Sequence, residues 1–269
     1  MNKLVIGVLL IIVLASVFAP FLTPHDPDEI NLDELRESPS LKHPFGTDSK
    51  GRDILSRVLY GGRVSLSVAA VAALVSLCVG LVIGLLSGYL GGTFDTAVMM
   101  LVDFILAFPS LLLAIGISVI LPPGIYTVMI VIAAVGWASF ARLIRGHVLS
   151  LRNAPFIEAA KAIGCSNTRI LLVHLFPQCI PLGIVVTGLK LGGYILTEAS
   201  LSFLGLGVQP PAPSWGSMIS TNRVFIISAP WMVIFPGLAI TATSLCCNML
   251  GDALNARYGF RMRGRSMSP

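Results

Sequence analysis

Charged residues are scarce in this chain of 269 residues. Asp, Glu, Lys and Arg make up 12% of it, hydrophobic residues make up 55%, and the mean hydropathy is +0.87. A soluble domain carries about 25% charged residues, so little polar surface remains here to face water. The apolar residues stand in long runs, not in the alternating segments of about ten residues that mark a membrane β-barrel. The composition therefore predicts an all-α membrane protein, because helices satisfy their backbone hydrogen bonds internally.

Motifs of catalysis and nucleotide binding are also missing. There is no GxxxxGK(S/T) loop and no Gly-Lys dipeptide, so we expect no ATP binding by that route. HExxH and GxSxG do not occur, which disfavours a membrane-embedded enzyme. The five cysteines form no CxxC spacing, and His25 and His43, with Asp26 and Asp28 nearby, contain no helical i, i+4 pair. We expect no catalytic residue, no metal site and no cofactor on this chain.

Six apolar runs are long enough to cross a bilayer, which takes about 20 residues per helix. They cover residues 4–22, 64–90, 96–121, 125–143, 180–206 and 230–250. The first run follows Lys3 and could be taken for a signal peptide. It is long for one, however, and no small-x-small cleavage site follows it. We therefore predict six transmembrane helices, the first of them retained.

Basic residues predict the orientation. The net charge of +5 would raise nucleic acid as a partner of a soluble protein, but the positive-inside rule explains it better here. With the N-terminus inside, ten Lys and Arg face the cytoplasm and seven face outward, six of the seven within residues 23–63. Outside that long loop the ratio is ten to one. We predict that both termini are cytoplasmic. The expected partner is the lipid bilayer and not nucleic acid.

Residues 1–63 form the first predicted unit, a transmembrane helix followed by a long outer loop. The loop begins acidic and rich in proline. From Ile54 onward an apolar stripe alternates with Arg52, Asp53 and Arg57, which predicts a short amphipathic helix at the interface or an extension of the second span. Trp215 and Trp231, near the last outer loop, suit an interfacial aromatic belt.

Three charged residues fall inside predicted spans and away from the span ends: Asp103, Lys190 and Glu198. A charge at the bilayer centre costs on the order of 2.5–3.5 kcal/mol on insertion scales, so each must face protein or water. These residues either line a polar pathway and its gate or pair with a neighbouring span or subunit. The fifth span carries both Lys190 and Glu198 and is rich in glycine, which permits close helix approach or bending.

Residues 152–177 interrupt two apolar runs with a polar segment. Asn153 is a suitable N-cap, Pro155 fits a first helical turn, and Gly164 fits a left-handed C-terminal position. Ser166 offers a second N-cap, and Pro177 should end or kink the helix that follows. Phe156, Ile157, Ala160 and Ile163 form one apolar stripe, with Glu158 and Lys161 beside it. The pattern predicts two short helices at a corner, either a docking element or an ordinary loop helix.

The segment Glu158-Ala159-Ala160, followed by Gly164 and Pro177, resembles the EAA motif of permeases in binding-protein-dependent ABC importers. Three further stretches, at 43–66, 198–218 and 248–259, resemble the C-type permease of the dipeptide, oligopeptide and nickel importers. Nearly the whole chain shares this resemblance. The tail 260–269 and the short N-terminus depart from it.

The resemblance implies a type I ABC importer permease, with residues 64–259 as a five-helix core and 260–269 as a basic cytoplasmic tail. It implies a heterodimer with a second permease, two cytoplasmic ATPases that hydrolyse the ATP, and an external solute-binding protein, in a bacterial inner membrane. The coupling residues it implies lie within 152–177: Glu158, Ala159, Ala160, Lys161, Gly164, Arg169, His174 and Pro177.

Di- or oligopeptides are the expected substrates, and nickel stays open as the alternative within the family. An ion-coupled secondary transporter, with Asp103, Lys190 and Glu198 as a relay, is the remote alternative. Such transporters often show internal repeats, and no repeat is visible here.

Overall fold

The computed structural model describes residues 2–265, and the side chains of residues 3–256. Within this part, regular structure is helical apart from one isolated bridge between Thr47 and Asp53. The elements are α1 (Asn2–Val17), α2 (Ala19–Leu22), η1 (Leu32–Glu34), α3 (Ile54–Leu90), α4 (Gly92–Ala107), α5 (Ser110–Ile120), α6 (Ile125–Leu151), α7 (Pro155–Ala162), α8 (Asn167–Arg169), η2 (Ile170–Leu175), α9 (Phe176–Phe203), α10 (Trp215–Asn222), η3 (Arg223–Phe225) and α11 (Trp231–Arg265). The all-α prediction is confirmed.

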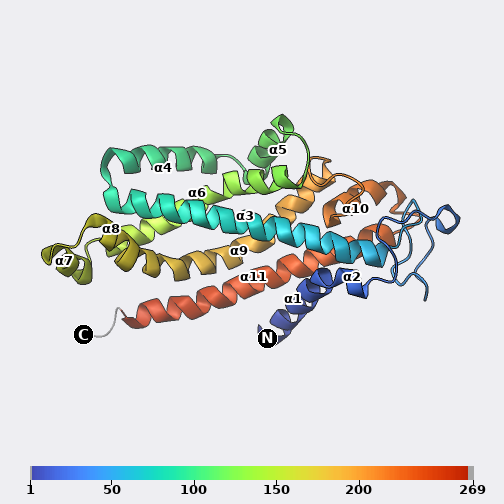
Figure 1. Ribbon diagram of the computed structural model, residues 1–269, viewed down its shortest axis with the longest axis horizontal. Helices are drawn as coiled ribbons and strands as arrows, with labels where there is room; N and C mark the ends of the chain where they lie inside the picture. Colours follow the sequence, from blue (N-terminus) through green and yellow to red (C-terminus); the bar gives the residue numbers. More distant parts are fainter. Residues whose placement is uncertain (1, 266–269) are drawn as a thin grey trace.

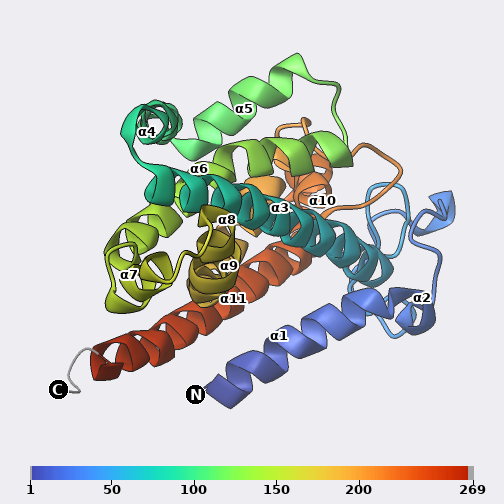
Figure 2. The same ribbon diagram turned by 60° about the vertical axis from the view of Figure 1, so that its left-hand side comes forward.

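The long helices lie side by side and give the molecule two distinct ends (Figure 1). One end, here the α7 end, holds α7, α8 and the C-terminal part of α11. The opposite end, the loop end, holds residues 23–53 and α10. Helix α1 runs toward the loop end and α11 runs away from it, so both termini point toward the α7 end (Figure 2).

Four helices are long and apolar enough to cross a membrane: α3, α6, α11 through Ala256, and the continuous run Asn167–Phe203. The α4–α5 pair is a fifth candidate. Helix α1 has 16 residues, about 24 Å at the helical rise, which is shorter than a hydrocarbon core of about 30 Å. The predicted tail covers residues 260–269; helix α11 continues through Arg265, and residues 266–269 lie outside the described residues.

The third predicted span, 96–121, is wrong as one straight helix. Helices α4 and α5 meet at an angle of 94°. Pro109 causes the break, because a proline ring disfavours helical backbone at the residue before it. Phe108 is accordingly extended, with φ −90° and ψ 145°.

Helices α3 and α6 form the centre of the bundle through a stripe of small residues. A Cβ at Gly84 would lie 2.5 Å from the Ala141 carbonyl oxygen, and one at Gly88 would lie 2.8 Å from the Val148 Cβ. Gly80 meets Phe140 in the same way. The two backbones therefore approach closely, as small residues allow in membranes.

Residues 54–63 belong to α3 and form no separate interfacial helix. Asp53 caps α3 by accepting a hydrogen bond from the Ser56 backbone N–H at 2.7 Å. The belt prediction for Trp215 is wrong, because this side chain is 1% exposed and its Nε1–H donates to the Val58 carbonyl at 2.9 Å. Such a buried indole anchors α10 against α3.

Candidate functional site

Helix α7 lies where the sequence predicts the first short helix of residues 152–177. Pro155 occupies its first turn, and the N-cap is Ala154, not Asn153 as predicted. The helix ends at Ala162, and Gly164 then adopts φ +80°, the left-handed conformation that glycine accepts without strain. The predicted corner is therefore present in the backbone.

Helix α7 is attached to the bundle by one face only. Ile157 and Ala160 are buried in a cluster with residues of α3, α6 and η2. Glu158, Ala159 and Lys161 are exposed. The predicted apolar stripe is only half buried, because Phe156 is 43% and Ile163 is 80% exposed. One face thus holds α7 in place and leaves polar and apolar groups outside.

The chain returns to the bundle through α8, η2 and α9, which form one run from Asn167. Ser166 caps its start by accepting a hydrogen bond from the Arg169 N–H, as predicted. Residues 170–175 are π-helical, and Pro177 follows in the first turn of α9. Proline has no N–H and its ring crowds the carbonyl four residues earlier, so a widened turn beside it is expected. Pro177 modifies this helix and does not end it.

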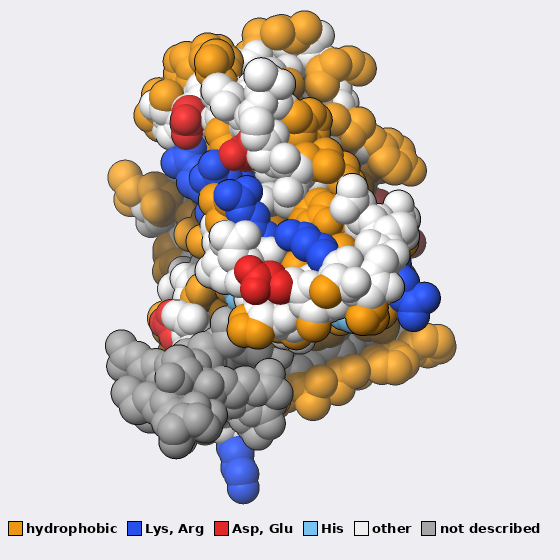
Figure 3. Space-filling model, turned by 90° about the vertical axis from the view of Figure 1, so that its left-hand side faces the viewer, with side chains coloured by type: hydrophobic (Ala, Val, Ile, Leu, Met, Phe, Trp, Pro, Cys, Tyr) orange, Lys and Arg blue, Asp and Glu red, His pale blue; other side chains and the backbone are white. Residues whose placement is uncertain are grey.

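The remaining coupling candidates lie on the same end. Gly164, Arg169 and Pro177 are exposed, and His174 is half-buried. The face of the molecule at this end carries a band of Lys and Arg side chains (Figure 3). Within residues 142–169 the basic residues are Arg142, Arg145, Arg152, Lys161 and Arg169, all exposed or half-buried.

The sequence analysis did not predict the contacts made by three residues: Asp95, Ser87 and Tyr89. The Arg145 Nε–H donates to Asp95 Oδ1 at 3.0 Å, and Ser87 bonds the same carboxylate, so α4 is tied to α3 and α6. Tyr89 O–H donates to Asn167 Oδ1 at 2.8 Å and so links α3 to α8. The Asp95–Arg145 contact could have been suspected from the sequence, because Asp95 is a charged residue one position before the third predicted span. The Tyr89–Asn167 contact joins residues 78 positions apart and has no local sequence signal.

The three charges of the predicted spans do not come together. Asp103 is exposed on α4 and pairs with Arg142 of α6. Glu198 is fully buried in α9, where it accepts a hydrogen bond from Ser202 Oγ at 2.7 Å. Lys190, on the same helix, is half-buried and lies eight residues from Glu198, about 12 Å along the axis. A direct relay through the three groups has no geometric support.

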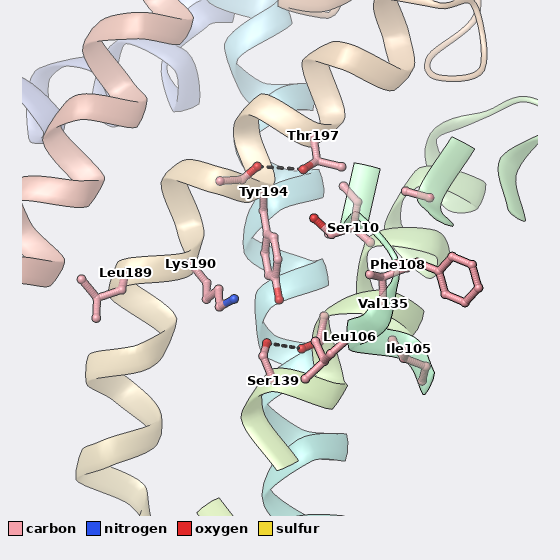
Figure 4. Close-up of a pocket in the computed structure, with 14 residues that line it drawn as sticks. Ile105, Leu106, Phe108, Ser110, Val135, Ser139, Leu189, Lys190, Tyr194 and Thr197 are labelled. Atoms are coloured by element: carbon pink, nitrogen blue, oxygen red, sulfur yellow. Dashed lines mark hydrogen bonds between the residues drawn. The ribbon is translucent and has the colours of Figure 1, made fainter. Parts of the chain in front are cut away.

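A cavity of about 270 Å³ opens between the α4–α5 break, α6 and α9. Lys190 and Tyr194 of α9 line one side, while Ser110 of α5 and Ser139 of α6 line others (Figure 4). A Cβ at Gly136 would overlap the Tyr194 hydroxyl, so glycine makes room for this ring. Most of the wall is apolar, and Lys190 is the one charged residue in it.

The loop end contains a second set of titratable groups. The centroids of the His25 and His43 rings lie 4.7 Å apart with the ring planes tilted by 32°, and His43 Nδ1 lies 2.9 Å from Asp53 Oδ1. His43 Nε2 lies 3.2 Å from Glu34 Oε2. The ligand atoms of His25, His43 and Asp53 lie within 4.8 Å of one another, a proximity that the sequence reasoning missed. The ring nitrogens of His43 are engaged by carboxylates, which ties the loop to the cap of α3.

Comparison with known proteins places these features in a family. Residues 80–264 match the model of the binding-protein-dependent transport system inner membrane component, and residues 5–44 match the N-terminal TM domain of oligopeptide transport permease C.

Among its relatives is the glutathione transport system permease protein GsiD of Salmonella paratyphi A, 44% identical over 259 residues, which cover 96% of this chain and 86% of the relative. The proteins of the same name from Shigella flexneri and Escherichia coli are 43% and 42% identical, each over 256 residues, 95% of this chain and 84% of the relative. The chain therefore belongs to the inner-membrane permeases of binding-protein-dependent ABC importers, in the peptide and nickel group.

Proposed function

We propose that this chain is one of two different permease subunits in a type I importer, and that α7 is the coupling helix that docks on a cytoplasmic ATPase. The observation that carries the proposal is the one-sided attachment of α7. Its inner face, Ile157 and Ala160, packs into the bundle, while Glu158, Lys161 and Ile163 are exposed. A partner that moves α7 would therefore move the ends of the long helices with it.

The arrangement of the ends supports the orientation. A band of Lys and Arg side chains crosses the face at the α7 end (Figure 3), and the N-terminal end of α1 and the C-terminal end of α11 both point toward this end (Figure 2). The positive-inside rule assigns such an end to the cytoplasm. We propose six crossings, with the short α1 and the broken α4–α5 pair added to the four long helices. The loop end then faces the external binding protein, and the partner ATPases hydrolyse the ATP.

A peptide is the proposed substrate. The relatives are named as glutathione transport permeases, and glutathione is a tripeptide. The lining of the cavity around Lys190 contains no His, the side chain whose imidazole suits nickel, and offers a cation and hydroxyl groups instead. Glutathione is therefore the first solute to assay, with nickel as the alternative within the family.

Site-directed cross-linking tests the docking. Ile163→Cys is made in a background with Cys78 and Cys165 replaced by Ser, and the membrane complex is treated with a short thiol cross-linker. Val224→Cys is the matched control, since Val224 is 73% exposed at the loop end. We expect Ile163→Cys alone to cross-link to the ATPase subunit. Cross-linking of Val224→Cys instead, or of neither variant in an assembled complex, would contradict the proposal.

A further inference from the structure

Lys190 stands in the membrane part of the fold without a counter-charge. It lies near the midpoint of α9, which spans Phe176–Phe203. Among the side chains that the structure describes, no carboxylate is within ion-pair distance of its ammonium. An unpaired ammonium at this depth is costly to keep, and such groups in membrane proteins mark ligand or ion pathways.

The ammonium points into the cavity between α9, α6 and the α4–α5 break (Figure 4). Two of the hydroxyl groups around it already donate within their own helices. Thr197 Oγ1–H donates to the Gly193 carbonyl at 2.9 Å, and Ser139 Oγ–H donates to the Gly136 carbonyl at 2.9 Å. The buried Tyr194 hydroxyl has no hydrogen-bond partner among the described residues, and Lys190 adds the one charged donor in the cavity lining.

The far wall of the cavity adds to the positive potential. Ser110 lines it and is the first residue of α5, whose preceding residue Pro109 provides no side-chain cap. The first backbone N–H groups of a helix have no partner within the helix and carry partial positive charge. An anion between Lys190 and this helix end would meet donors from both sides.

The cavity volume sets the size of that anion. About 270 Å³ is slightly below the usual range of small-molecule pockets, about 300–1,000 Å³. A cavity of this size accommodates one end of a short peptide and is too small for a whole larger ligand. Apolar walls exclude water, which strengthens a contact between an ammonium and a carboxylate.

We propose that this cavity is a passage site for the C-terminal carboxylate of the transported peptide, with Lys190 as the residue that recognises it. The inference rests on the proposed peptide importer and adds a selectivity element within the permease itself. Peptides with a free C-terminal carboxylate pass Lys190 more readily than their C-terminal carboxamides.

The test uses the complete complex in proteoliposomes, with ATP inside the vesicle on the ATPase side and loaded binding protein on the other. Uptake of glutathione is compared with uptake of its glycine carboxamide analogue, for wild type, Lys190→Gln, Lys190→Arg and Thr197→Val. The preference of the binding protein is the same in all four complexes, so it cancels when their acid-to-amide ratios are compared. Thr197→Val is the matched control, because its hydroxyl is already bonded to its own helix.

We expect Lys190→Gln to lower the acid-to-amide uptake ratio about tenfold, the range of a charge-assisted hydrogen bond. Lys190→Arg should retain most of the wild-type acid-to-amide uptake ratio, and Thr197→Val should leave that ratio unchanged. An unchanged ratio in Lys190→Gln would overturn the proposal. So would a Lys190→Gln complex that falls apart on size-exclusion chromatography while Lys190→Arg assembles, since Lys190 would then pair with another subunit. Wild-type complex without ATP-driven peptide uptake would instead refute the proposed function.

Discussion

The two ends of the molecule are built in opposite ways. At the loop end, Arg52 and Arg57 are buried and bonded within the chain: Arg52 Nε–H donates to Asp48 at 2.8 Å, and Arg57 donates to the Pro27 carbonyl at 2.6 Å. At the α7 end, Glu158, Lys161 and Ile163 face outward. These two buried arginines are satisfied within the chain, while the exposed Glu158 and Lys161 of α7 remain open to a partner. A surface that must move with a partner differs in this way from a surface that must keep its shape.

The largest expected effect on stability comes from a substitution in α3, the helix that runs between the two ends. Gly84→Leu places a side chain where Ala141 and Ile144 of α6 already lie. We expect destabilisation at or above the upper end of the about 1–3 kcal/mol that overpacking costs. Thermal unfolding in detergent, followed by size-exclusion chromatography, measures it. Gly146→Leu is the matched control, because nothing lies within 4 Å of a Cβ there. Equal losses in both variants would argue against the close α3–α6 contact.

The second prediction concerns Arg57→Met, which removes hydrogen bonds that hold the loop end together. The change removes the donors to the Pro27 carbonyl and to Asp28 Oδ1, at 2.6 and 3.0 Å, and leaves a buried carbonyl without its partner. We expect a loss of about 1–3 kcal/mol, seen as a lower melting temperature, with the amount of ATPase bound to the complex unchanged. If ATPase binding is lost while the melting temperature holds, the division of roles between the ends is wrong.

Tyr89→Phe acts on the α7 end. It removes the single hydrogen bond from Tyr89 to Asn167, which lies at the surface and contributes about 0.5 kcal/mol. We expect almost no change in melting temperature but a several-fold lower ratio of transported peptide to hydrolysed ATP, because α8 loses a tie to α3. The ratio in Asn167→Ala should fall equally, and a double variant should fall no further. Additive losses would show that the two residues act separately.

The smallest effect concerns pH at the loop end. The hydrogen bond from Lys42 lowers the pKa of the Glu34 carboxyl below its usual range. A lowered folded-state pKa stabilises the fold above the unfolded-state pKa and ceases to do so as the pH falls through the folded value. The melting temperatures of wild type and Glu34→Gln should therefore converge between neutral pH and about pH 3. A gap that stays constant with pH would exclude the ion pair as its cause.

The sequence predicts elements with local signals and misses those that depend on distant contacts. Pro155 and Gly164 place α7 within one residue, since both act through their own backbone angles. Pro109 is a local signal of the same kind for the α4–α5 break. The sequence analysis did not use this signal, because Pro109 lies within a long apolar run. Trp215 suited a membrane belt by type, but its burial depends on Val58, 157 residues away.

The candidate sites show the same division. The exposure of Ile163 contradicts the simple rule that an apolar stripe faces the bundle, because α7 ends at Ala162 and Ile163 follows it as the exposed C-cap residue. The cavity around Lys190 combines α5, α6 and α9, so no single stretch of sequence could reveal it. Spacing alone identified the charged residues and left their neighbours unknown.

The most direct test of coupling through α7 is Gly164→Pro in the reconstituted complex, with ATP hydrolysis and peptide uptake measured in the same vesicles. Proline requires φ near −65°, whereas Gly164 has φ +80°, so the turn after α7 must change. We predict a complex that assembles and hydrolyses ATP but imports less than about a tenth of the wild-type amount of peptide per ATP, because coupling depends on geometry. Wild-type uptake per ATP in this variant would contradict the assignment of α7 as the coupling helix.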